Sequence, residues 1–385
     1  MSTSHQSQGP DKGRRAVSTL ELFFDLVFVF TLTQLTALLG EHLSYETIIQ
    51  VILVFVNLFW MYSGYGWLTN QAPPNNTHRR ILIIAGMTGF MIAALAIPGA
   101  FGASGLDFAL AYLFVVLIHS ALYYEVAGNS VLRFAPLNIL GALALVVGSF
   151  VEGPWRLWIW VIPIGLHYLT SYIVYRINRT SASPLSLYAD HFVERHGLLL
   201  LVALGESVVA IGIGIGGAKL SNGNYLAIVL GLALAAGIWW SYFDKDAQRA
   251  ESVLENARPH DKVGIAIHGF FYSFILMLLG IVALAAGLEH AVSHATHPNN
   301  LSYAISLSAG AALYLLGGVV FRVTIQASPI RYRLIAVLFV LASALLGIYT
   351  TSLIQLGALV CIFSLMLIRE NFVEYGTTGS ERNCS

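Results

Sequence analysis

Hydrophobic residues fill this chain in long blocks that short polar segments separate. Each block is close to the ~20 apolar residues that an α-helix needs to cross a bilayer. The blocks predict twelve membrane-spanning helices, at residues 19–39, 47–69, 80–99, 107–126, 134–151, 156–177, 190–216, 223–243, 263–287, 301–321, 333–350 and 353–370. Residues 334–368 form one apolar stretch that is too long for a single span, so we predict a tight turn near "GIYTTS".

The composition agrees with this pattern. Of the 385 residues, 57% are hydrophobic and 10% are charged, whereas a soluble domain has roughly 25% charged residues. So few charges cannot cover a surface that faces water, and we predict an all-α integral membrane protein whose main partner is the lipid bilayer. The zero net charge gives no bulk attraction to nucleic acid. The two cysteines, Cys361 and Cys384, provide neither a disulfide framework nor a metal-ligand spacing.

The distribution of basic residues predicts how the helices are oriented. If the N-terminus is cytoplasmic, 18 of the 20 Lys and Arg residues fall in inner segments or at inner helix ends, and only Arg156 and Lys219 fall outside. Positive residues mark the cytoplasmic side of a membrane protein. We therefore expect both termini in the cytoplasm, with residues 1–17 and 371–385 as tails. Residues 1–17 are polar and Ser-rich rather than a signal peptide.

Polar landmarks recur in the same order in residues 18–180 and 188–370. Glu21 is followed thirteen residues later by Gln34, and Glu194 is followed twelve residues later by Glu206. The next predicted helix of each half ends in a Trp-rich stretch, "LFWMYSGYGW" or "GIWWSYFD". Because six is even, two six-helix halves would form a parallel repeat. The alternative is that Trp and basic residues are common at the helix ends of any multi-span protein.

Two segments resemble a known family. "STLELFFDLVFVFTLTQL" at 18–35 and "HFVERHGLLLLVALGESVV" at 191–209 are similar to the bacterial low temperature requirement A (LtrA) family. This resemblance implies a multi-pass protein of the bacterial inner membrane, and it supplies no mechanism. Phe23, Phe24 and Asp25 also resemble the Phe-Ser-Asp motif of the lysosomal potassium-channel family, although Phe24 stands in place of the Ser. That family's motif has an Arg one turn earlier, where this chain has Thr19. The second half of this chain has no Phe-x-Asp motif at the corresponding place.

Two carboxylates lie close together on the first predicted helix. Glu21 and Asp25 are four residues apart and therefore share a helix face. A charge in hydrocarbon costs at least ~2.5 kcal/mol, so we expect one carboxyl to be protonated or the pair to be neutralised by a cation. The alternative is an ion pair with Arg14, Arg15 or a basic loop at the membrane interface.

Glu206 is harder to place at an interface. It lies twelve residues after Glu194, which is roughly 18 Å along a helix at ~1.5 Å per residue. Such a residue must face the bundle interior, a polar partner or water. It is either a functional group or a structural hydrogen-bonding group. The run "GIGIGG" at 212–217 favours close helix packing.

Further polar residues lie inside predicted spans. His167 is near the middle of its span and suits a proton relay, or else a packing histidine. We take Gln34, Asn57, His191, Arg195 and His268 as supporting polar residues. His191 and Glu194 resemble one turn of a metal site, but no ligand cluster of fixed spacing accompanies them, so we predict no metal and no cofactor.

These residues favour transport. We expect Glu21, Asp25, Glu194, Glu206 and His167 to form an ion or proton path in a coupled transporter or a cation channel. No P-loop appears in its required context, so no ATP drive is visible. The ion or solute is not specified by the sequence, and a homodimer is left open.

A membrane-embedded enzyme is the alternative. The same carboxylates would then act as general acids on a lipid or isoprenoid-like substrate, and the 46 aromatic residues could wall its site. A passive sensor or scaffold would leave Glu206 unexplained.

Overall fold

The computed structural model describes residues 15–181, 186–217 and 220–382. The predicted N-terminal tail, with Arg14, therefore lies mostly outside the described residues. Every secondary-structure element among the described residues is a helix, and none is a strand. The α-helices are α1 (Thr19–Glu41), α2 (Tyr45–Gln71), α3 (Thr77–Ala96), α4 (Gly105–Ala127), α5 (Ala135–Ser149), α6 (Trp155–Thr180), α7 (Ala189–Ile215), α8 (Asn222–Phe243), α9 (Asp246–Asn256), α10 (Pro259–Ile265), α11 (Ser273–Ser293), α12 (Leu301–Thr324), α13 (Arg331–Tyr349) and α14 (Ser352–Arg382). Three short elements join them, η1 (Ile97–Gly99), η2 (Gly128–Arg133) and the π-helix η3 (Ala266–Tyr272).

These helices confirm the predicted class. Eleven helices in the described part of the chain are long and apolar enough to cross a membrane, and the fifth predicted span is the shorter α5, of 15 residues. The elements α10, η3 and α11 run on as one span from Pro259 to Ser293. The turn predicted near "GIYTTS" lies between Tyr349 and Ser352. The protein is therefore an all-α, multi-pass membrane protein.

Local sequence explains where several helices begin. Ser18 caps α1, because its side chain accepts a hydrogen bond from the Glu21 amide and the Glu21 carboxylate accepts one from the Ser18 amide at 2.9 Å. Such a capping box satisfies amides that the helix itself cannot pair. Ser44, Asn76 and Asn300 cap α2, α3 and α12 in a simpler way. Glu21, one of the two carboxylates of the candidate site, therefore also stabilises the start of α1.

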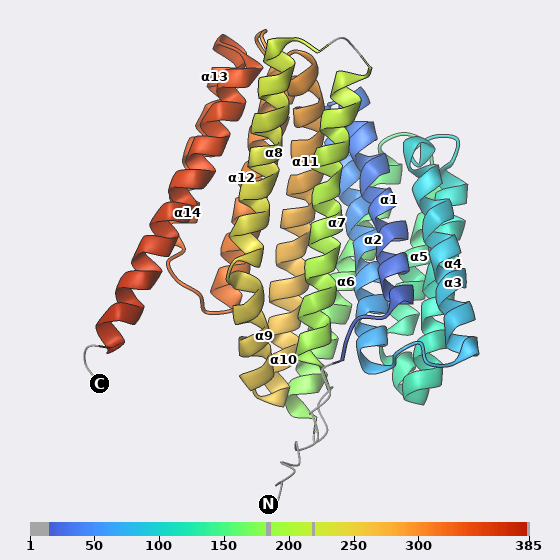
Figure 1. The fold of residues 1–385 in the computed structure, drawn as a ribbon. Helices are drawn as coiled ribbons and strands as arrows, with labels where there is room; N and C mark the ends of the chain where they lie inside the picture. The colour runs from blue at the N-terminus through green and yellow to red at the C-terminus, as the bar shows by residue number, and fades with distance from the viewer. Residues whose placement is uncertain (1–14, 182–185, 218–219, 383–385) are drawn as a thin grey trace, which may run out of the picture.

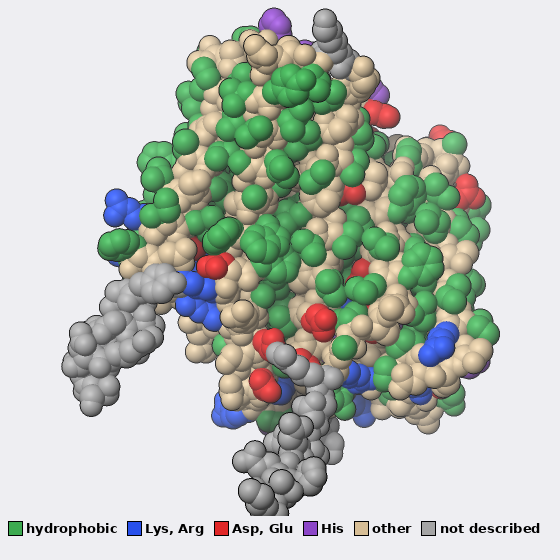
Figure 2. All heavy atoms as spheres, in the orientation of Figure 1, with side chains coloured by type: hydrophobic (Ala, Val, Ile, Leu, Met, Phe, Trp, Pro, Cys, Tyr) green, Lys and Arg blue, Asp and Glu red, His purple; other side chains and the backbone are tan. Residues whose placement is uncertain are grey.

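The helices run roughly parallel to one another (Figure 1). Helices α3, α4 and α5 lie on one side of the bundle, α13 and α14 on the other, and α1, α7 and α11 between them. Hydrophobic side chains are spread over the whole face seen in Figure 2, and most of the Lys and Arg side chains visible there lie in its lower half. Helix α1 packs against α7 and α11 as well as α2 and α3, so it joins the two predicted halves. The internal repeat itself stays a prediction.

Close packing holds α11 against α12. A Cβ added at Gly310 would lie 2.3 Å from the Leu284 backbone nitrogen, and one at Gly280 would lie 2.6 Å from the Tyr314 nitrogen. Only glycine permits this approach, which is how helices associate in a membrane without a hydrophobic driving force. Helices α11 and α12 thus form a closely packed pair, and α11 also packs against α1 and α7.

Candidate functional site

The acid pair of α1 meets a buried cation on α7. Arg195 donates from Nη1 to Glu21 Oε1 and from Nη2 to Asp25 Oδ1, both at 3.1 Å. All three side chains are at most 3% exposed. The cation that pairs with both acids therefore comes from the other predicted half of the chain. Arg15, one of the partners considered from the sequence, instead donates its backbone amide to Asp190 at 2.6 Å.

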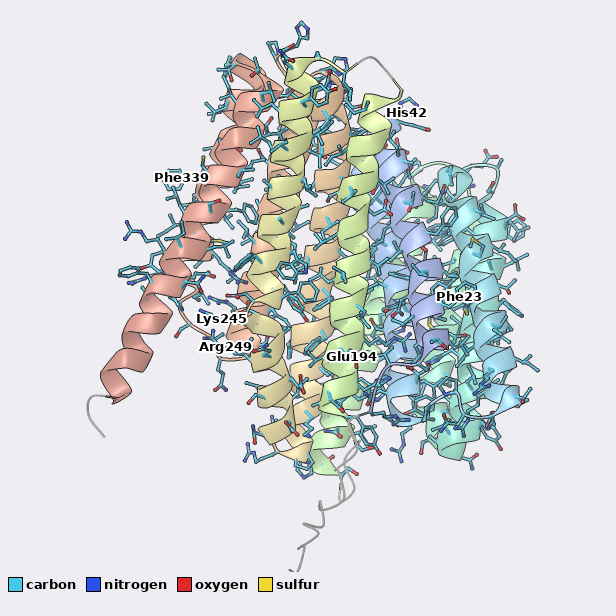
Figure 3. The ribbon with its side chains drawn as sticks, viewed as in Figure 1. Phe23, His42, Glu194, Lys245, Arg249 and Phe339 are labelled. Carbon is cyan, nitrogen blue, oxygen red and sulfur yellow. The ribbon has the colours of Figure 1, made fainter. Side chains whose placement is uncertain are left out.

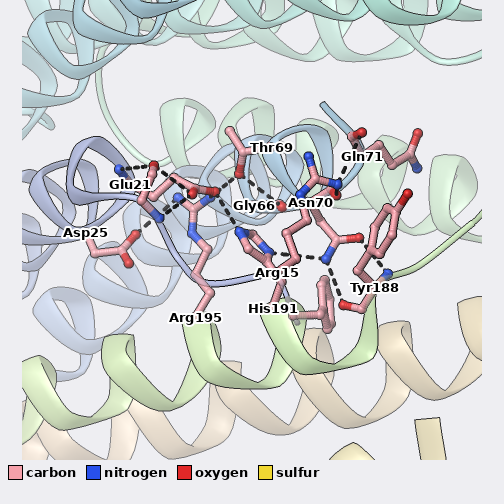
Figure 4. Close-up of polar contacts among 12 residues, drawn as sticks. Arg15, Glu21, Asp25, Gly66, Thr69, Asn70, Gln71, Tyr188, His191 and Arg195 are labelled. Atoms are coloured by element: carbon pink, nitrogen blue, oxygen red, sulfur yellow. Dashed lines mark hydrogen bonds and ion pairs between the residues drawn. The ribbon is translucent and has the colours of Figure 1, made fainter. Parts of the chain in front are cut away.

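Neighbouring polar groups extend this network (Figure 4). His191 lies one turn before Arg195, and its Nε2 is 3.1 Å from Glu21 Oε1. Its Nδ1 is 3.2 Å from the amide of Asn70, which also donates to the Tyr188 carbonyl at 2.9 Å. The Arg195 guanidinium bonds Thr69 as well. We call Glu21, Asp25, His191 and Arg195 the α1–α7 charge network.

The charges in this network do not balance without a proton. Two carboxylates face one guanidinium, so one negative charge remains unless His191 or a carboxyl group carries an added proton. Tyr62 donates to Asp25 Oδ1 at 2.8 Å, whereas Asp25 Oδ2 is buried with no hydrogen-bond partner among the described residues. A buried uncompensated charge is strongly unfavourable. The network is thus suited to binding and releasing a proton.

Glu206 lies further along the same helix interface. Its Oε1 accepts a hydrogen bond from Thr33 of α1 at 2.6 Å, and its side chain is buried. At ~1.5 Å per residue, it lies about 25 Å from the start of α7 and about 13 Å from its end. The α1–α7 interface therefore carries acids at two depths.

A cavity of about 480 Å³ lies among α2, α4, α6, α7 and η3. Its wall runs from helix-end residues, such as Gln71, Ala127 and Ser181, to mid-helix residues, such as Trp60 and His119. The cavity therefore opens at the end of the bundle where α1 begins. Its aromatic wall is formed by Trp60, Trp67, Tyr123, Phe134, Phe192, Phe270 and Phe271.

Polar side chains also line the cavity, and they include Ser63, Gln71, Asn138, Thr170 and Asn178. His119 is 4% exposed, and its ring lies against Gly64 of α2, where its Nε2 is 3.0 Å from a Cβ built on that glycine. His196 also lines the cavity, with Nδ1 2.8 Å from the Phe192 carbonyl oxygen. Among the described lining residues, Arg133 alone carries a formal charge, and it is exposed near the mouth. An apolar pocket of this size with a few polar groups is typical of a small-molecule site.

A second buried charge cluster lies in the other half. Asp246 is 3.0 Å from Arg322 Nε and 3.0 Å from Arg333 Nη2. Glu370 is 3.3 Å from Arg322 Nη1 and 3.1 Å from Arg333 Nε. Two acids and two arginines balance within this cluster. It ties α9, α12, α13 and α14 together and encloses little space, so its role is structural.

The remaining predicted site residues do not join one path. Glu194 is exposed on α7, away from the charge network (Figure 3). His167 is buried, with Nε2 3.3 Å from the Tyr112 hydroxyl and its ring stacked on Trp60. Asn57 donates to the Leu53 carbonyl at 2.7 Å. Gln34 is half-buried, and His268 is exposed.

Sequence reasoning gave little weight to the groups that define the cavity. His196 follows Arg195 directly, and His119 lies inside the predicted span 107–126, so no polar pattern marks either residue as part of a cavity. Their spacing to aromatic residues was the available signal, since Phe192 and His196 are four residues apart. Among the described residues, no group of three or more His, Cys, Asp or Glu side chains could hold a metal ion.

Comparison with known proteins shows which family this chain belongs to. The model of the family described as bacterial low temperature requirement A protein (LtrA) matches residues 16–368. The chain belongs to the LtrA family. An LtrA relative in Rhizobium meliloti (strain 1021), named as an uncharacterized protein, is 27% identical over 307 residues, which cover 77% of this chain and 75% of that protein. No solved structure matches the chain significantly. The resemblance seen in the sequence is confirmed, and both charge-network acids lie within the matched range.

Proposed function

We propose that this LtrA protein is a proton-coupled carrier of a small amphipathic organic anion. The cavity is the solute site, and the α1–α7 charge network is the part that responds to protons. The main support for this proposal is that one turn of α7 contributes residues both to the charge network and to the cavity. His191 and Arg195 contact the acids of α1, while the adjacent Phe192 and His196 line the cavity.

This geometry links the two sites through one rigid element. If a bound solute shifts the turn from Phe192 to His196, the same movement changes the contacts of His191 and Arg195. A ligand shifts a conformational equilibrium only through contacts that differ between two states. Here one turn of α7 contains both the residues that would contact the solute and the residues that contact the acids of α1.

The charge of the lining supports an anion. Arg133 at the mouth attracts a negative group, and no described lining residue is Asp or Glu. The aromatic wall suits an apolar body. Aromatic rings also attract cations, so a cationic probe is the fair alternative in any test.

A cation channel fits these contacts less well. Its acids would face a water-filled path, whereas Glu21 and Asp25 both pair with Arg195 in a buried helix interface. One observation favours the enzyme alternative, because His119 lines the cavity and could serve as a general acid or base beside a bound substrate. An enzyme would return a changed molecule, while a carrier returns the same one.

Binding of benzenesulfonate to the purified protein tests the proposal, with phenyltrimethylammonium as the matched cation. Trp60 and Trp67 line the cavity, so tryptophan fluorescence reports occupancy. Ala127→Phe narrows the mouth, whereas Leu132→Phe adds a ring at an exposed position five residues away.

We expect benzenesulfonate to bind, Ala127→Phe to weaken binding, Leu132→Phe to leave it unchanged, and the anion to be recovered intact. Binding of the cation alone, or an Ala127→Phe variant that binds like wild type, would contradict the proposal. A chemically altered product would favour the enzyme.

A further inference from the structure

We infer that Glu206 is a second proton-binding site of this carrier, besides the α1–α7 charge network, and that its proton arrives from the end of the bundle opposite the cavity mouth. This inference rests on the proposed function and names the route of its coupling ion. The route follows the seam where α1, α7 and α11 pack together.

On α1, the seam is lined by Thr33, Thr36 and Gly40. These positions are three and four residues apart and therefore share one helix face. Thr33 donates to Glu206. Thr36 is 6% exposed, and its hydroxyl has no hydrogen-bond partner among the described residues. A buried hydroxyl without a partner is costly, and a water or proton passing along the seam would satisfy it.

Beyond Thr36, the seam reaches Glu289 of α11. A Cβ built on Gly40 lies 3.5 Å from Glu289 Oε2, and one built on Gly214 lies 2.4 Å from the Glu289 carbonyl oxygen. These two glycines let α11 bring a half-buried carboxylate between α1 and α7. Glu41, which is exposed, lies close enough for its charge to act on Glu289. Acids thus lead from the bundle end toward Glu206.

Toward the cavity mouth, the same seam is apolar. Between Thr33 and Asp25 the α1 face carries Val29, which is 7% exposed, and the corresponding stretch of α7 carries fully buried Leu199 and Ala203. These side chains separate Glu206 from the α1–α7 charge network. A proton on Glu206 therefore exchanges more readily with the Glu289 end.

The surrounding titratable groups agree with this direction. Helix α11 brings Glu289 and His290 to the far end, and α1 and its C-cap bring Glu41 and His42 there. At the level of Arg195, α2 provides Tyr62, which bonds Asp25, and α8 provides Tyr242, 3.9 Å from a Cβ built on Gly197. The charged residues of α9 lie near the start of α7, and they are Asp246, Arg249, Glu251 and Glu255.

Dicyclohexylcarbodiimide tests this inference without a solute, because it adds to protonated carboxyl groups in apolar surroundings. Labelling of each acid is read by peptide mass spectrometry in proteoliposomes of known orientation, with pH varied on one side at a time. We expect Glu206 to be labelled and Glu21 to be spared, since Glu21 pairs with Arg195 and His191. In the titrating range, raising pH on the Glu289 side should lower Glu206 labelling by up to about tenfold per unit, as for a single proton site.

Glu289→Gln is the diagnostic variant, and Glu194→Gln, exposed on α7, is its matched control. We expect Glu289→Gln to slow the response of Glu206 labelling to a pH jump, and Glu194→Gln to leave it unchanged. The inference is overturned if Glu206 is never labelled, if its labelling follows pH on the cavity side, or if Glu289→Gln responds like wild type. If this labelling behaves as expected while benzenesulfonate fails to bind, the solute assignment fails and the proton site stands.

Discussion

Replacing Arg195 by methionine removes the guanidinium that both acids of α1 share. Arg195 is 3.1 Å from Glu21 and 3.1 Å from Asp25, and all three side chains are at most 3% exposed. Removing one partner of a buried ion pair typically costs ~3–5 kcal/mol, because the remaining charge stays buried. We therefore expect Arg195→Met to lower the free energy of unfolding by about that amount.

A matched exposed pair provides the control. Arg79 Nε lies 2.9 Å from Glu125 Oε1, and both side chains are roughly a quarter exposed. Exposed pairs contribute ~0.2–1 kcal/mol, so Arg79→Met should cost no more than that. Unfolding in mixed detergent–SDS micelles, followed by circular dichroism, measures both free energies.

The triple variant Glu21→Gln, Asp25→Asn, Arg195→Met separates charge from packing. Neutralising a whole buried cluster is often neutral or stabilising, so we expect the triple variant to recover most of the stability that Arg195→Met loses. An Arg195→Met variant as stable as wild type would refute the reasoning, because it would mean that both carboxyls are already neutral in the native protein.

Three further predictions concern other parts of the molecule. Asp246→Asn should cost ~3–5 kcal/mol by the same logic, and a double variant with Arg195→Met should show additive losses, since no residue is shared between the two clusters. Gly310→Ala should destabilise the protein by ~1–3 kcal/mol, because the added methyl group overpacks against α11. Gly212→Ala, with no atom within 4 Å of the added Cβ, should be neutral or up to ~1 kcal/mol more stable. Thermal unfolding measures both variants, and equal losses of stability would contradict this packing. Reporter fusions after residues 100 and 290 should lie on the side opposite to fusions after residues 180 and 385, and one reversed fusion would break the twelve-span topology from that point onward.

The spans were predictable because apolar length alone defines them. The turn between α13 and α14 and the all-helical class follow directly from the hydrophobic blocks. The importance of Glu21 and Asp25 was also visible, since buried charges in a membrane helix always require a partner. Sequence could not show that Arg195 is that partner, because the two sites are 170 or more positions apart along the chain.

The inward face of a membrane helix is difficult to read from sequence. Lipid is as apolar as the protein interior, so hydrophobicity does not mark which side faces the bundle. Glu194 and Arg195 are neighbours in sequence, yet Arg195 is 2% exposed and Glu194 is exposed. The cavity is hidden for a similar reason, because its lining comes from separate helices that only the packed fold brings together.

The same limit applies to the second charge cluster. Asp246, Arg322 and Arg333 lie near helix ends, and Glu370 lies near the end of the apolar part of α14, where charges usually face water. Packing of α9, α12, α13 and α14 buries all four together. Only the distances between them reveal a balanced buried cluster rather than four solvated residues.

Solute uptake by proteoliposomes tests proton-coupled carriage most directly. Benzenesulfonate stays ionised and does not cross lipid by itself, so its accumulation under an imposed pH gradient reports the protein alone. We predict accumulation that a protonophore abolishes, that Glu206→Gln removes and that Glu194→Gln leaves intact. Uptake no greater than in protein-free vesicles, or uptake that a protonophore leaves unchanged, would contradict a proton-coupled carrier, whereas equal uptake by Glu206→Gln would contradict the role of Glu206 alone.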